Sequence, residues 1–191
     1  MTVLSDALKE QIFQIYRRQP RVAKLFLFND IPAAKLENAI ASYAYIVDDD
    51  EEIILLYDDT LFGSSKEGFL LTSNRLYSKN IADSGFYADV DIIERMVIDI
   101  GRLTSSIMVY DSEEMVLNMQ VTQASGKAEN NAVFHVLNET VRLLRDNAAI
   151  GAEGGAGVKA KEPGQLPIQC RGCGAPVVAG VAACEYCGAG Y

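Results

Sequence analysis

The chain has 191 residues, of which 49% are hydrophobic and 23% are charged, and its formal net charge is −9. This composition excludes disorder of the whole chain, and the length suits one ordinary domain with a small second unit. No apolar run approaches the roughly 18–20 residues that cross a bilayer, and the N-terminus lacks the residue order of a signal peptide, so we expect a cytoplasmic protein. The acidic surface disfavours nucleic acid and anionic membranes as partners.

Residues 1–45 are expected to form a helical segment. Apolar residues recur at helical spacing from Leu4 to Ile15 with Ser5 as the N-cap, and Pro32 lies in the first turn of a second helix. The apolar stretch 25–28 is predicted to dock on the following domain; an exposed patch for a partner or a second copy is the alternative. Residues 1–25 carry five basic and two acidic residues, so this +3 segment is the candidate for any membrane or nucleic-acid association.

Residues 46–147 are expected to form an antiparallel β domain with a closing helix, which makes the fold class α+β. An amphipathic helix is predicted over 128–147, and His135, the only histidine, is placed on its surface. A strongly bent sheet or open barrel, with the helix plugging one end, is the expected arrangement. The predicted strands are short apolar or alternating runs at 53–59, 68–72, 75–79, 86–90, 96–100, 105–111 and 115–121.

The stretch DDTLFGSSKEGFLLTSNRLYSK, with the strands and helix that follow it, resembles the bacterial PH-like domains over about residues 51–147. The resemblance rests on the turn 59–63, the strand 66–72 and the following Leu76-Tyr77. It implies a binding scaffold without catalytic residues. Phosphoinositide-binding PH domains have a cluster of Lys and Arg between their first strands, whereas this chain has Lys66 beside an acidic lead-in, so membrane binding is not expected.

Catalytic motifs are absent from the sequence, and we expect no enzyme. The chain has one histidine, no cysteine before Cys170, and none of the glycine-rich phosphate loops or nucleophile motifs of common enzymes. The acidic run 48–52 lacks the spacing and the glycine of an EF-hand, and it is predicted to be a solvated charge run. Asp58 and Asp59 are adjacent, so in a strand they point to opposite faces and cannot act as a carboxylate pair.

All four cysteines lie in the last 22 residues, behind a Gly- and Ala-rich stretch, 148–167, that is predicted to be a flexible linker. Cys170 and Cys173 form one CxxC pair, and Cys184 and Cys187 form a second pair after ten residues. Two such turns supply four thiolates to one tetrahedral ion, and each pair continues into a glycine. The segment 168–191 resembles the zinc ribbons, and one structural Zn(II) ion is predicted.

Other roles for the four thiols stay open beside structural zinc. A rubredoxin-like iron centre uses the same ligands, so the sequence alone does not separate zinc from iron. Two disulfides would need an oxidising compartment, and a redox-active CxxC would need a helix start in a thioredoxin-like unit. A closed four-cysteine zinc site has no open coordination position, so its metal acts as a folding staple.

Together these features predict a cytoplasmic, non-enzymatic adaptor or scaffold that binds a protein partner. The first alternative is a thiol-based redox or zinc-responsive regulator. The second is a membrane- or nucleic-acid-associated module that uses the basic N-terminal segment. The partner, the pathway and the formation of a homo-oligomer are left open by the sequence.

Overall fold

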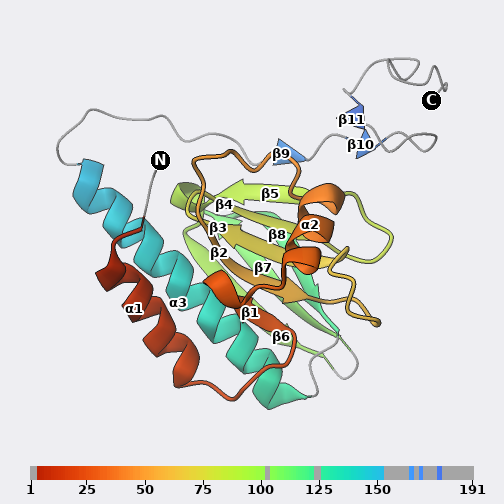
Figure 1. The fold of residues 1–191 in the computed structure, drawn as a ribbon, viewed down its shortest axis with the longest axis horizontal. Helices are drawn as coiled ribbons and strands as arrows, with labels where there is room; N and C mark the ends of the chain where they lie inside the picture. Colours follow the sequence, from red (N-terminus) through yellow and green to blue (C-terminus); the bar gives the residue numbers. More distant parts are fainter. Residues whose placement is uncertain are drawn as a thin grey trace.

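The computed structural model describes residues 4–101, 104–122 and 126–152, together with three two-residue strands in the C-terminal part of the chain. Two antiparallel sheets carry most of the structure (Figure 1). The larger sheet has the strand order β1-β2-β3-β4-β5-β9, and the smaller has the order β6-β7-β8. The described strands of the larger sheet are β1 (Leu25–Leu27), β2 (Ile53–Asp58), β3 (Gly68–Thr72), β4 (Arg75–Lys79), β5 (Phe86–Asp89) and β9 (Gly164–Gln165). Those of the smaller sheet are β6 (Arg95–Ile100), β7 (Ser105–Asp111) and β8 (Glu114–Val121), and β10 (Ile168–Gln169) and β11 (Pro176–Val177) form a separate pair.

The α+β class and the seven predicted strands are confirmed, because the strands coincide with β2–β8 to within a residue or two at each end. The expected strongly bent sheet or open barrel is corrected in one respect: the described strands divide into two antiparallel sheets, and these do not make a closed barrel. Two features keep the sheets apart. The short 3-10 helix Val90–Ile92 turns the chain between β5 and β6, so these two strands do not continue one ladder. The outer edge of β2, which could have closed a barrel, is occupied by β1.

The apolar stretch 25–28 docks on the domain as predicted, and it does so as a strand within the segment that was expected to be helical. Leu25 and Leu27 are buried, and Leu25 pairs with Tyr57 of β2. Alternation explains this outcome, because in an extended backbone both leucines point to the main core while Phe26 packs against the opposite face of the sheet. The helical prediction holds for α1 (Asp6–Arg17) and α2 (Ala33–Ser42).

The larger sheet is buried on both faces, which explains why its strands are continuous apolar runs. One face joins the main core, which it shares with the smaller sheet, α1 and α3 (Lys127–Ala152). The other face carries a smaller cluster around Tyr43, Leu56 and Tyr77, which is covered by α2 (Figure 1). Helices α1 and α3 pack side by side (Figure 1). Helix α3 includes the predicted range 128–147 and continues into the stretch expected to be linker.

The β2–β3 hairpin depends on one glycine. Gly68 has φ +126°, and a Cβ at this position would lie 2.0 Å from the carbonyl oxygen of Tyr57. A glycine is therefore required where the two strands pair, since any side chain would collide with backbone. At the other end of β3 the chain turns at Ser73-Asn74, and Thr72 Oγ1 accepts hydrogen bonds from the amides of Asn74 and Arg75.

Within the described ranges, none of the helices combines the length and the apolar character needed to span a bilayer.

Candidate functional site

The predicted metal ligands Cys170, Cys173, Cys184 and Cys187 lie outside the described residues. Among the residues that the structure does describe, no group of three or more histidine, cysteine or acidic side chains is gathered as a metal site. His135 is exposed on α3, as expected. Within the described residues, the buried charged groups of the β domain form two polar networks.

The acidic run 48–52 has a structural role that its sequence did not indicate. Asp48, Asp49 and Asp50 are exposed, as predicted, but Glu51 is buried, so the prediction of a solvated run is wrong for this residue. Glu51 Oε1 lies 2.6 Å from the guanidinium of Arg75, and Glu51 also accepts a hydrogen bond from the Thr72 hydroxyl. Burial of a carboxylate requires such a partner, and the partner stands 24 residues downstream in β4.

Arg75 joins several acidic groups at this end of the sheet. Its guanidinium lies 3.1 Å from Asp48 and 3.2 Å from Asp89, and it stacks on the ring of Tyr87. The charge of this cation is therefore offset within the fold by Glu51 and two aspartates. The network fastens the segment before β2 to β4 and β5, and we assign it a structural role.

Asp58, at the end of β2, is the centre of a second network, and its side chain is fully buried. Its Oδ1 accepts hydrogen bonds from the amide and the hydroxyl of Thr60 and, at 3.1 Å, from the amide of Ser65. Thr60 Oγ1 in turn accepts the amide of Ser64 at 2.7 Å. One carboxylate thus fixes both sides of the turn that connects β2 to β3.

Two lysines from the N-terminal segment complete this network. Lys35 Nζ, on α2, lies 2.5 Å from both Asp58 Oδ2 and the carbonyl oxygen of Gly63. Lys24 Nζ donates to the carbonyl oxygen of Thr60. Lys35 neutralises the buried carboxylate of Asp58, and both lysines donate to backbone carbonyl oxygens of the turn. The turn is therefore held from three separate chain segments.

Burial alone would raise the pKa of Asp58, since desolvation disfavours its charged form. The hydrogen bonds from Lys35 and Thr60 and the charge of Lys35 outweigh this effect, so the pKa of Asp58 lies below its ordinary value. Burial, and then the nearby charge of Asp58, raise the pKa of Tyr43 well above its ordinary value. The Tyr43 hydroxyl is buried without a hydrogen-bond partner among the described residues. This tyrosine stays neutral and packs as part of the apolar cluster under α2.

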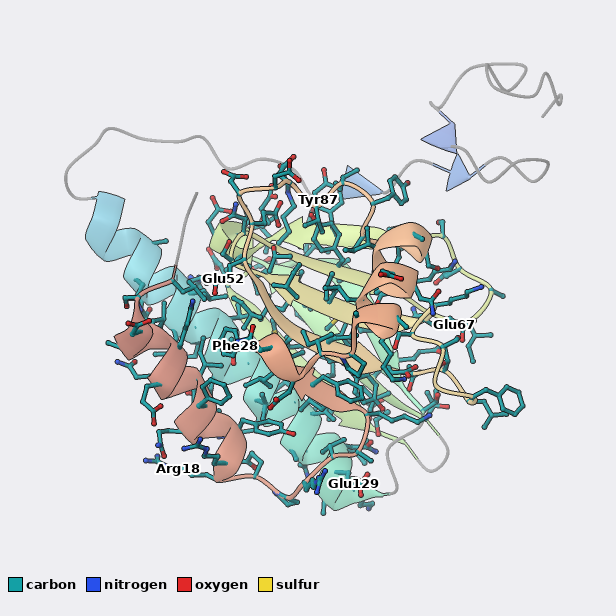
Figure 2. All side chains as sticks on the ribbon, in the orientation of Figure 1. Arg18, Phe28, Glu52, Glu67, Tyr87 and Glu129 are labelled. Carbon is teal, nitrogen blue, oxygen red and sulfur yellow. The ribbon has the colours of Figure 1, made fainter. Side chains whose placement is uncertain are left out.

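The fixed turn presents two large apolar side chains to solvent. Leu61 is 69% exposed and Phe62 is 93% exposed, although both lie within a turn whose backbone is tightly bonded. The turn lies on the side of the sheet away from α1; Figure 2 labels Glu67 at its base and Arg18 at the opposite side of the molecule. We call residues 60–65 the buttressed turn.

The buttressed turn is joined to the smaller sheet through β8. Asp59, as predicted, points away from the Asp58 network: its carboxylate accepts hydrogen bonds from the amide and the hydroxyl of Thr122, at 2.7 and 2.8 Å. The loop after β4 makes a similar connection, because Asn80 bonds to Asn118 and Gln120. Both connections reach the C-terminal part of β8 or Thr122, the residue directly after it. Because Asp58, Gly68 and Lys79 pair across neighbouring strands, the turn and the loop leave the same end of the larger sheet.

The exposure of Leu61 and Phe62 was not predicted from the sequence. A signal was present, because DDTLFGSS places two large apolar residues between polar residues that favour a turn. The interpretation depends on burial, however, since the same pair could equally have folded into the core. The burial of Asp58 and its pairing with Lys35, 23 residues upstream, could not be read from the pattern.

Comparisons with protein families, with curated proteins and with solved structures find no match to this chain.

Proposed function

We propose that this protein is a non-enzymatic, cytoplasmic adaptor that binds a partner protein, and that Leu61 and Phe62 on the buttressed turn are its main contact. The observation that carries this proposal is that two apolar side chains are exposed to water on a turn whose backbone is held by several buried polar contacts. A fully buried aspartate and two lysines immobilise a surface turn whose outward features are Leu61 and Phe62. Burial of a carboxylate costs free energy, and here the buried carboxylate stabilises a turn that holds two apolar side chains in water.

The energetics suit a binding hot spot. Burying a side chain such as Phe or Leu stabilises a complex by about 1.5–3 kcal/mol relative to leaving it in water. A turn that is already ordered loses little conformational entropy on binding, so most of that gain is retained. Aromatic anchors of this kind usually dominate the affinity of an interface. We expect a partner with an apolar pocket that takes the Phe62 ring.

Two further features support an adaptor. A four-stranded meander β2–β5, a three-stranded meander β6–β8 and a closing helix α3 follow one another in the order that the resemblance to PH-like domains implies. The donor set of Cys170, Cys173, Cys184 and Cys187 fits a structural Zn(II) ion, and a zinc ribbon on a linker would add a second, tethered contact that raises the overall affinity. Metal binding needs cysteines that are not oxidised to disulfides, which suits the reducing cytoplasm.

A site-specific crosslinker tests the proposal. Benzoylphenylalanine at position 62 should capture one protein partner in the native cell, whereas the same group at the exposed His135 on α3 should not. With the purified partner, Phe62→Ala should weaken binding by about thirty-fold, which corresponds to about 2 kcal/mol. His135→Ala should bind as tightly as the unchanged protein.

The same variants distinguish the competing interpretations. An unchanged affinity of Phe62→Ala for the captured partner would remove the buttressed turn from the interface. If the protein binds vesicles of neutral phosphatidylcholine and Phe62→Ala loses this binding, the target of the turn is a membrane surface and not a protein partner. Release of zinc by peroxide together with a change in partner binding would favour a thiol-based regulator.

A further inference from the structure

The buttressed turn shares its end of the larger sheet with the start of β5. Gly68, which follows the turn, pairs with Lys79 at the end of β4. Ser78 in turn pairs with Phe86, the first residue of β5. The turn, the loop 80–85 and the start of β5 therefore lie along one end of the sheet.

The tail of the chain leaves the sheet at this same end. Strand β9 pairs with the outer edge of β5, with Gly164 opposite Tyr87 and Gln165 opposite Phe86. Because β9 is antiparallel to β5, it ends where β5 begins. Only residues 166–167 separate it from β10. The chain that follows β9 therefore starts beside the loop that connects β4 to β5.

Strands β10 and β11 flank the first cysteine pair. They pair with each other, and the residues that connect them include Cys170 and Cys173. We call residues 168–191 the cysteine unit. Cys170 stands five residues after Gln165, so an extended chain carries it at most about 18 Å from the end of β9. The pairing of β9 thus confines the start of the cysteine unit to this end of the sheet.

Exposed apolar side chains gather at the same end. Among the described residues, the large hydrophobic side chains that stay exposed are Leu61, Phe62, Ile81 and Met115. Ile81 is 57% exposed and lies in the loop after β4. Met115 lines a groove of about 310 Å³ together with Asp83 of that loop and Phe86 of β5. Apolar groups are therefore exposed from the buttressed turn to the part of β5 at which β9 pairs.

The dimensions of this end suit a single protein interface. Strands β3 and β9 are separated by three strand spacings, or about 14 Å. A standard interface covers about 800 Å² on each partner, which is a patch about 30 Å across. One partner can therefore contact the buttressed turn, Ile81 and the cysteine unit at the same time.

We propose that β9 fixes the cysteine unit beside the buttressed turn, so that the two form one surface for a single partner protein. This inference rests on the proposed adaptor function and makes its second contact a fixed one. The partner presents a continuous apolar surface that covers Leu61, Phe62 and Ile81. A fixed arrangement loses less conformational entropy on binding than a tethered one, so it gives the higher affinity.

The strand on the β5 edge belongs to the chain itself. Residues 153–163 connect α3 to β9, and a connection of this length gives an effective concentration on the order of mM. The tail of a second copy would have to reach a similar concentration to replace β9. The shared surface is therefore assembled within one molecule.

The first test follows the tail in the full chain without a partner. Backbone NMR relaxation should give residues 168–191 the rotational correlation time of the β domain. The double variant Gly164→Pro, Gln165→Pro removes two backbone donors from β9, so the cysteine unit should tumble faster. The matched control Gly155→Pro, Gly157→Pro changes the chain before β9 and should leave the correlation time unchanged.

The second test uses the partner captured at position 62. Benzoylphenylalanine in place of Ile81 or of Arg171 should crosslink that same protein, whereas it should not do so at His135. The double variant in β9 should bind the purified partner about tenfold more weakly, because the cysteine unit returns to a tether. The control double variant before β9 should keep the affinity of the unchanged protein.

Three results would overturn the inference. The first is a cysteine unit that tumbles independently of the β domain in the unchanged protein. The second is equal affinity of the β9 variant and its control for the partner. The third is a correlation time that rises with protein concentration while the β9 contact is lost on dilution, since β9 would then pair with a second copy.

The crosslinks separate this inference from the proposed function. If positions 81 and 171 capture one protein and position 62 captures none, Phe62 is not the main contact, and the shared surface stands. If position 62 captures a protein that neither position 81 nor position 171 reaches, the shared surface is refuted and the buttressed turn keeps its role.

Discussion

Replacing Lys35 by methionine tests the network that holds the buttressed turn. The change keeps the length and apolar stem of the side chain and removes only the charge that neutralises Asp58. Asp58 is fully buried and Lys35 is 22% exposed, so the pair is well shielded and water can reach it only from the lysine side. Asp58 would keep its bonds from Thr60 and Ser65 and lose the one from the ammonium group.

The expected loss of unfolding free energy follows from these contacts. Removing one partner of a fully buried ion pair costs about 3–5 kcal/mol. Three hydrogen bonds to Asp58 remain, and water has partial access, so we expect about 2–3 kcal/mol for Lys35→Met. Lys9→Met is the matched control. Lys9 pairs with Glu52, but both side chains are more than 20% exposed, and such a pair contributes at most about 1 kcal/mol.

The pH dependence identifies Asp58 as the cause. In the unchanged protein the pKa of Asp58 is lowered on folding, so its contribution to stability is present above the unfolded value of about 3.9 and is lost as the pH falls through the folded pKa. In Lys35→Met burial dominates and the pKa of Asp58 rises. Because a protonated Asp58 no longer needs the lysine, the stability deficit of the variant should be largest near neutral pH and should shrink below about pH 4.

Urea unfolding followed by circular dichroism measures these differences, since the chain has nine tyrosines but no tryptophan to report by fluorescence. The midpoint should fall for Lys35→Met at an unchanged slope. A loss no larger than that of Lys9→Met, or a deficit that stays constant from pH 7 to pH 3, would show that the Lys35–Asp58 pair does not hold the turn.

Three further outcomes are expected. Gly68→Ala should prevent stable folding, because its Cβ would lie 2.0 Å from the Tyr57 carbonyl oxygen. Gly63→Ala would meet side-chain atoms only, the Lys35 ammonium at 3.2 Å and Asp58 Oδ2 at 3.6 Å, and should cost about 1–2 kcal/mol because of its positive φ. Urea midpoints and soluble yield compare the two variants, and similar losses would contradict the backbone clash at Gly68. Arg75→Met should lower the free energy of unfolding by about 3 kcal/mol, because it leaves Glu51 buried without its cation. Adding Glu51→Gln to Arg75→Met should recover part of that loss in the same urea assay. No recovery would contradict the pairing of the two residues. Native mass spectrometry should find one zinc ion per chain that is lost in Cys184→Ser, and a metal-free chain would remove the ribbon from the proposal.

Local patterns were sufficient for the elements of the β domain. Strands β2–β8 are short apolar or alternating runs separated by turn residues, and α3 repeats apolar residues such as Val133 and Val136 at helical spacing, so each element carries its own signal. The same local logic showed that Asp58 and Asp59 diverge, since neighbours in an extended chain point to opposite sides. It also placed the apolar stretch 25–28 on the domain.

Local patterns do not predict pairing between residues that are far apart in the sequence. The division into two sheets was not predicted, because the edge of β2 is taken by β1, whose three residues are too few to carry a strand signal of their own. Glu51 was predicted to be part of a solvated run because no residue near it in the sequence indicates its partner, the guanidinium of Arg75.

The amino-acid sequence by itself therefore determined the helices α1–α3 and the strands β2–β8, and the spacing of its four cysteines predicts a four-thiolate metal site, because both depend on residues close together in the chain. Only the tertiary structure decided which charges are buried and which apolar side chains stay in water. Burial depends on partners brought together from distant segments: Lys35 and Asp58 meet across 23 residues, and their contact leaves Phe62 exposed on a rigid turn. The function proposed here rests on that second kind of information.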